Sequence, residues 1–246
     1  QKTVSYEIGI WQELMKGMGL ELSLYYRDIY DLLSTRIIST YNQIAYGLYT
    51  NKDYGNARGM EVKWDYQLGR IFTSLNYTLA YTRGNADNAD QTFDRAEQSM
   101  DPIPRLIPMS WDQRHTLNTT VSYTRKNFGM TITGFYNSGR PYTYEPVGTS
   151  ILSRINLYEN NAFKPEGISF DLSSYRNIKL FGGLEGQITL NIYNLFDRKN
   201  SRKVYADTGQ PYTEIVYDSQ REGHRGTFTD YLDRIHDPTH YSAPRQ

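Results

Sequence analysis

Apolar and polar side chains alternate along most of this 246-residue sequence. In eight segments nearly every second residue is apolar: 4–10, 20–26, 60–66, 71–81, 117–123, 128–132, 168–172 and 184–192. A period of two is typical of β-strands whose two faces meet different surroundings. We predict eight strands of roughly 10 to 15 residues each, longer than is usual in globular proteins and long enough to cross a bilayer.

The connections between these segments differ in length in a regular way. Short turns are expected near residues 14–18, 68–70, 125–127 and 181–183, and long connections at about 36–56, 84–113, 139–166 and 197–246. Short and long connections alternate strictly, as they do in a transmembrane β-barrel with short periplasmic turns and long extracellular loops. The predicted fold is therefore all-β, an antiparallel transmembrane β-barrel. A soluble β-rich module such as a sandwich or propeller is the alternative, and it gives no reason for this sorting of connections.

The direction of the strands predicts more about the barrel. The first expected strand, at about 3–13, starts on the side of the long connections, and the eighth, at about 184–196, finishes there. An open eight-stranded sheet cannot lie in lipid, because its edge groups would lack hydrogen-bond partners. We therefore expect residues 1–246 to be one part of a larger barrel, with at least one further strand after Gln246. No export signal is visible after Gln1, which fits either a cleaved signal or an internal piece of a longer protein.

Composition narrows the classes of function. With 27 basic and 27 acidic residues the formal net charge is zero, so no basic footprint for nucleic acid is present. The absence of cysteine excludes disulfides and cysteine-ligated zinc or iron–sulfur sites. The 23 tyrosines, with 9 Phe and 3 Trp, are typical of the aromatic girdles at membrane interfaces.

Five short motifs, in order along the chain, resemble those of TonB-dependent outer-membrane transporters. They are Tyr26-Arg27-Asp28-Ile29, Asn56-Ala57-Arg58-Gly59-Met60-Glu61, Trp111-Asp112-Gln113-Arg114-His115-Thr116-Leu117-Asn118, Ser138-Gly139-Arg140-Pro141-Tyr142 and Asn194-Leu195-Phe196-Asp197-Arg198-Lys199-Asn200. The last motif is the most specific. The family-motif residues singled out are Gly59, Glu61, Asp112, Arg114, His115, Asn194, Leu195, Phe196 and Asp197.

The resemblance implies that residues 1–246 are the C-terminal section of a barrel of about 22 strands in a Gram-negative-type outer membrane. The plug domain, the earlier strands and the final strand have no counterpart in this sequence. Such a receptor imports a scarce siderophore, vitamin, saccharide or peptide, and a TonB complex acts on it through the N-terminal region. A surface lipoprotein is a further partner that the resemblance allows, beside outer-membrane lipid. Neither enzymatic activity nor a cofactor is implied. A passive porin or an outer-membrane barrel enzyme is the alternative.

The long connections hold the candidate substrate-binding residues. Aromatic and cationic side chains at a loop mouth suit ligand capture, although ordinary loop packing explains them equally well. The candidates are Tyr46, Tyr49, Arg95, Arg105, Tyr142 and Tyr144.

Other chemistry is better explained by structure. Asp112 and His115 lack an accompanying nucleophile motif, so we expect a hydrogen bond between Asp112 and Arg114 at a strand start. Glu61, Lys63 and Asp65 share one strand face and are expected to form a polar lumen wall. The acidic cluster Asp87, Asp90 and Asp94 lacks a calcium-loop pattern. His236 and His240, with His224 upstream, lack a zinc motif, and Pro238 stands between the first two.

Overall fold

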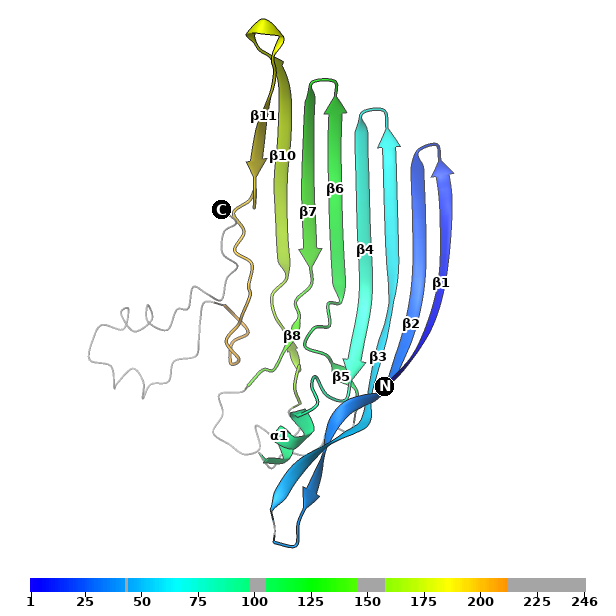
Figure 1. Cartoon of the computed structure of the whole chain (residues 1–246), viewed down its shortest axis with the longest axis vertical. Coiled ribbons are helices and arrows are strands. Elements are labelled where there is room, and N and C mark those ends of the chain that lie inside the picture. The colour runs from blue at the N-terminus through cyan, green and yellow to red at the C-terminus, as the bar shows by residue number, and fades with distance from the viewer. Residues whose placement is uncertain (43, 98–104, 146–157, 212–246) are drawn as a thin grey trace, which may run out of the picture.

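Eight long antiparallel strands make up most of the part of the chain that the computed structural model describes, residues 1–42, 44–97, 105–145 and 158–211. The long strands are β1 (Lys2–Met15), β2 (Met18–Ser39), β3 (Ala45–Leu68), β4 (Ile71–Gly84), β6 (His115–Arg125), β7 (Phe128–Asn137), β10 (Gly167–Lys179) and β11 (Glu185–Ile192). They lie in the sheet in the order in which they occur in the chain, as Figure 1 shows. This arrangement confirms the predicted antiparallel all-β fold.

The remaining elements belong to the connections. The two-residue strand β5 (Ile107–Pro108) pairs with β4, and β8 (Pro141–Tyr142) pairs with β9 (Ala162–Phe163). One short helix, α1 (Gln91–Glu97), lies in the second long connection, and a 3-10 turn, η2 (Phe181–Gly183), joins β10 to β11. No helix in the described residues is long and apolar enough to cross a membrane.

The four predicted short turns are present at one end of the sheet. Gly17, Gly69, Gly182 and Gly183 all have positive φ angles, between 58° and 80°, which glycine adopts without steric cost. These glycines let the chain reverse within two to five residues. The prediction of a loop at 36–56 is wrong, because β2 and β3 continue as a hairpin that reaches Ser39 and resumes at Ala45.

The register places apolar side chains on one face across all the strands. One row of cross-strand partners joins Leu22, Val62, Tyr77, Leu117, Tyr136 and Ile168. The neighbouring row on the other face joins Glu21, Lys63, Asn76, Asn118, Phe135 and Ser169. The sheet therefore has one apolar and one largely polar face, as the alternation predicted.

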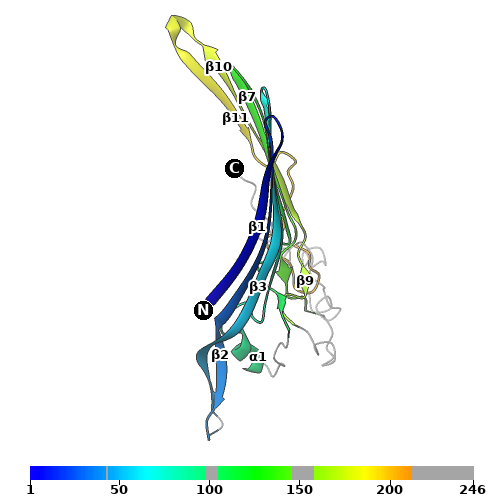
Figure 2. The same ribbon diagram turned by 90° about the vertical axis from the view of Figure 1, so that its right-hand side faces the viewer.

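No second layer covers the apolar face within the described residues. Ile8 and Ile188 are 72% and 61% exposed, and the only hydrophobic side chains buried in the described part of the chain are Ile107 and Met109, both in a connection. Figure 2 shows the sheet as a single curved layer. A water-soluble fold of this size would bury such side chains in a core. An apolar face left uncovered in this way fits contact with lipid.

The turns are staggered in a way that measures strand tilt. Met18 pairs with Tyr66, but the next hairpin closes at Leu68, two residues further on. Ile71 pairs with Tyr123, and that hairpin closes at Arg125, again two residues on. If all the turns lie at one level of the membrane, each strand is shifted against its neighbour by about one residue. This is a shift of about 3.3 Å along the strand for every ~4.8 Å between neighbouring strands. This corresponds to a tilt of about 35°, within the range of transmembrane barrels.

The two outer strands leave the sheet open. Among the described residues β1 pairs only with β2, and β11 pairs only with β10. The first and last long strands therefore do not close a barrel with each other.

Candidate functional site

The long connections meet the sheet at a rim, and the predicted motif residues hold that junction together. Asp112 is fully buried, and its carboxylate accepts the Thr82 N–H at 2.7 Å. Arg114 lies 3.3 Å from the same carboxylate and places its guanidinium 4.3 Å from the centre of the Tyr81 ring. The expected bond between Asp112 and Arg114 is thus present, and the hydrogen bond between Asp112 and Thr82 fixes the second long connection to β4.

His115 has a separate partner. Its Nδ1 lies 2.8 Å from the Tyr77 hydroxyl, and the two rings are stacked with centroids 6.1 Å apart. Asp112 and His115 therefore serve different contacts, and their arrangement is that of a structural strand start.

The last of the five motifs, which begins with Asn194 to Asp197, turns the chain as it leaves β11. Asn194 and Asp197 have φ angles of 52° and 47°, a left-handed conformation that asparagine and aspartate tolerate better than most residues. The Asn194 side-chain oxygen accepts the Arg198 N–H at 3.0 Å, as in other asparagine-stabilised turns. The Leu195 N–H donates to the Phe170 carbonyl at 2.7 Å, and the Phe196 ring meets Phe170 edge-on at 5.5 Å. The residues of this motif therefore stabilise a turn.

Asn200 extends the sheet with its side chain. Its amide accepts the Ile168 N–H and donates to the Ile168 carbonyl, both at 2.9 Å. It thus provides both hydrogen bonds that a neighbouring strand residue would provide, after β11 has ended.

Gly59 and Glu61 lie on the polar face of β3. A side chain at Gly59 would collide with the Leu79 carbonyl and the Tyr25 ring, so only glycine lets that ring lie flat on the strand. Glu61 is exposed, and two residues further Lys63 lies 3.6 Å from Asp65. The carboxylates line a hydrated wall, as predicted for a lumen.

The second and third long connections are joined by side-chain contacts. Arg95 of α1 pairs with Glu159 at 2.8 Å, in a partly buried position. Asn160 donates to the Asp87 carboxylate at 2.6 Å, and the Arg105 guanidinium lies 4.3 Å from the centre of the Tyr158 ring.

The β2–β3 hairpin is fastened to the same assembly. The Thr35 hydroxyl donates to the Ala89 carbonyl at 2.7 Å. The ring of Phe93, on α1, packs against Gly47 of the hairpin. A hydrogen bond to Asp90 raises the pKa of the Tyr49 hydroxyl. Three external segments are therefore connected in series.

Tyr142 and Tyr144 lie where the third connection meets the fourth. Burial, with smaller effects from Tyr144 and Asp207, raises the pKa of the Tyr142 hydroxyl, which lies against Gly209. The Glu145 N–H donates to the Ala206 carbonyl at 3.0 Å. Burial, and secondarily Arg140, lowers the pKa of Lys164 nearby.

The six predicted substrate-binding residues come from three different external segments. Tyr46 and Tyr49 lie on the hairpin, Arg95 and Arg105 on the second connection, and Tyr142 and Tyr144 on the third. The pairings of Arg105 with Tyr158 and of Arg95 with Glu159 were not predicted, because no local pattern in the sequence indicates which loops meet.

The acidic residues and the histidines that the sequence singled out lie partly inside and partly outside the described residues. Asp87 accepts the Asn160 amide and the Ser110 N–H, and Asp90 accepts the Thr35 hydroxyl. Within the described ranges no three His, Cys, Asp or Glu side chains are arranged to hold a metal ion. His224, His236 and His240 lie outside the described residues.

Comparison with known proteins identifies one family and several similar folds. The sequence profile of the family described as TonB dependent receptor-like, beta-barrel, matches residues 1–195. No curated protein sequence matches the chain. Among solved structures, the outer membrane transporter YddB from Escherichia coli is 12% identical with a TM-score of 0.59, over 81% of this chain and 29% of that one.

Two further structures have the same fold over a similar span. The FrpB iron transporter from Neisseria meningitidis (F3-3 variant) is 15% identical with a TM-score of 0.52, over 80% of this chain and 27% of that one. The ferric-catecholate import receptor Fiu from E. coli K12 is 14% identical with a TM-score of 0.52, over 85% of this chain and 25% of that one. This chain thus spans less than a third of the length of these proteins.

Proposed function

Because this chain belongs to the TonB-dependent receptor-like β-barrel family, we propose that it is part of an outer-membrane transporter that a TonB complex energises. The transporter imports a scarce substrate, and this chain supplies barrel wall and external loops. The family's barrels lie in the outer membrane, which agrees with the uncovered apolar face of the sheet. This placement removes the alternative of a soluble binding module.

The observation that carries the proposal is the connected set of loops above a polar wall. The pairs Arg95–Glu159, Asp87–Asn160 and Thr35–Ala89 tie three external segments together. A transported solute needs such a fixed capture surface, since preorganised loops lose less conformational entropy on binding. The polar face of the sheet then offers a hydrated path.

We further propose that the eight strands are an arc of a larger barrel. The edges of β1 and β11 carry backbone groups that need partners in lipid, and other strands of the complete protein provide them. The stagger of about one residue per strand fits a barrel whose number of strands and shear are nearly equal.

Among the candidate substrate-binding residues, Arg105 is the most suitable cation. It is exposed and stacks on Tyr158, whereas Arg95 is nearly buried and already paired with Glu159. Tyr46, Tyr49, Tyr142 and Tyr144 remain candidates for stacking on a ligand. FrpB is an iron transporter and Fiu a ferric-catecholate receptor, so ferric chelates are the first substrates to test.

Uptake measurements on the complete protein that carries this chain test the proposal. The protein is expressed in an outer-membrane host without its own ferric-chelate receptors, and accumulation of radiolabelled iron chelates, cobalamin and oligosaccharides is followed. We expect saturable uptake of one class that stops when tonB is deleted or a protonophore is added. Uptake that continues unchanged without TonB would support a passive porin instead, and substrate cleavage at the cell surface would indicate a barrel enzyme.

A further inference from the structure

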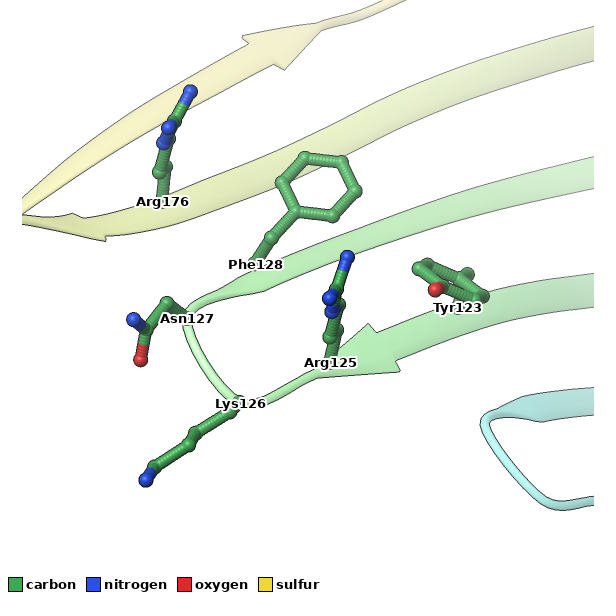
Figure 3. Close-up of a pocket in the computed structure, with 6 residues that line it drawn as sticks. All are labelled: Tyr123, Arg125, Lys126, Asn127, Phe128 and Arg176. Atoms are coloured by element: carbon green, nitrogen blue, oxygen red, sulfur yellow. The ribbon is translucent and has the colours of Figure 1, made fainter.

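A pocket lies at the short turn between β6 and β7, at the opposite end of the strands from the long loops. Its volume is about 630 Å³, and it is lined by Tyr123, Arg125, Lys126, Asn127, Phe128 and Arg176 (Figure 3). Three of these six side chains are cations and two are aromatic. The Tyr123 and Phe128 rings lie 6.4 Å apart at an angle of 51°.

The register shows that this pocket opens on the apolar face. Arg125, Phe128 and Arg176 form one row of cross-strand partners, and their side chains project to the same side in Figure 3. The row lies two residues from the row of Tyr123 and Met130, so both rows have the same facing. The two arginines therefore stand at the edge of the lipid-facing band.

Within the described residues the cations of the pocket form no ion pair with a carboxylate. No lining residue is acidic, and no ion pair in the described residues involves Arg125, Lys126 or Arg176. An uncompensated charge cluster at the boundary of a bilayer attracts anionic lipid. Guanidinium groups can also form two parallel hydrogen bonds to one phosphate.

Apolar side chains continue from the pocket toward the middle of the bilayer. Ile188 pairs directly with Arg176 and is largely exposed, and Leu190 and Met130 follow on the same face. An anion bound between the arginines would thus lie above a surface that suits an acyl chain. A soluble phosphate would gain nothing from that surface.

We propose that this pocket binds the phosphate headgroup of an anionic phospholipid, drawn from the leaflet that meets the short turns. Arg125 and Arg176 hold the phosphate, Lys126 adds long-range attraction, and the two rings contact the glycerol region. The lipid would also brace the β6–β7 and β7–β10 pairs, since its ligands come from three strands. This inference depends on the membrane facing of the sheet and is independent of the transported substrate.

Lipid binding to the complete protein in neutral detergent tests this proposal. Phosphatidylglycerol and phosphatidylethanolamine are added separately, and bound lipid is counted by native mass spectrometry over a concentration series. We expect wild type to retain phosphatidylglycerol preferentially. Replacing both arginines, R125Q with R176Q, should weaken phosphatidylglycerol binding about thirtyfold and weaken the binding of phosphatidylethanolamine, whose ammonium group already offsets its phosphate charge, much less.

The matched control is Arg70→Gln, which removes a cation from the neighbouring short turn but not from the pocket. It should change the affinity less than twofold. Equal weakening by Arg70→Gln, or equal affinity of wild type for both lipids, would overturn the proposal. So would displacement of the lipid by millimolar inorganic phosphate, which would make this a site for free anions.

Folding of the variants is monitored by the change in gel migration on boiling. If the double glutamine variant does not fold, the pair R125K with R176K retains both charges and loses the two-point contacts. Intermediate weakening by that pair supports the proposal, and unchanged binding contradicts it.

Discussion

Replacing Val62 with arginine should block assembly of the barrel, because this position lies near the middle of the lipid-facing band. On β3 the band runs from Arg58 to Leu68, and the ten steps between these residues, at about 3.3 Å each and about 35° of tilt, give about 27 Å. Val62 lies four residues from the outer end of that band. Its cross-strand neighbours, Leu22 and Tyr77, are both apolar and offer no partner for a guanidinium.

The expected cost follows from the depth of the position. An arginine at the midplane of a transmembrane barrel costs about 2–4 kcal/mol. That range corresponds to a folding equilibrium constant lowered by about thirty- to a thousandfold. The native sequence already carries a charge one residue further on, at Lys63, but on the other face, where it lies 3.6 Å from Asp65.

The matched control is Asn118→Arg, on the polar face of β6 between Asn76 and Phe135. Both variants of the complete protein are expressed at equal levels, and the folded fraction in the outer membrane is measured from unboiled gels. Denaturation in lipid vesicles then gives the free energy of unfolding. We expect a severe loss for Val62→Arg and a change under about 0.5 kcal/mol for Asn118→Arg. Equal losses, or a larger loss at Asn118, would refute the assigned facing.

Three further predictions concern the rim and the loops. Asp112→Ala should lower the free energy of unfolding by about 2–3 kcal/mol in detergent, because it leaves the part-buried Thr82 N–H and the Arg114 guanidinium without their carboxylate partner, and Asp112→Asn should recover part of this loss. Asn200→Asp keeps the acceptor and loses the donor, so hydrogen exchange at residues 167–170 should accelerate, whereas an unchanged rate would contradict the strand-like role of this amide. A double-mutant cycle with Arg95→Ala and Glu159→Ala should give a coupling energy of about 1 kcal/mol, and additive effects would mean that the two connections are not joined there.

The sequence predicted the features that depend on local pattern. Alternation fixes which side chain faces which side, so the facing of Val62 and Lys63 followed from their neighbours along the chain. The alternation of short and long connections predicted which end of the sheet carries the turns and which carries the long loops. The Asp112–Arg114 contact was also accessible, because its members are two residues apart.

The sequence did not reveal contacts that depend on the folding of distant segments. Arg95 and Glu159 are 64 positions apart, and only the pairing of the strands below brings their loops together. Arg125 and Arg176 line the same pocket because they lie on the two strands that neighbour β7, and both are register partners of Phe128. The β2–β3 hairpin was missed for another reason: its asparagines and Gly47 resemble loop composition, although apolar residues such as Ile37 and Leu48 alternate within it.

In the proposed transporter, the stagger of the hairpins sets the order in which a solute would meet the side chains of the polar wall. Rows of cross-strand partners, such as Lys63, Asn76 and Asn118, run obliquely to the barrel axis because the strands are tilted. A solute that moves parallel to the barrel axis would pass from one strand to the next, and it would not follow the side chains of a single strand. Groups that follow one another along β3, such as Glu61, Lys63 and Asp65, thus lie on a line oblique to the barrel axis, and a solute would contact polar side chains of successive strands in turn.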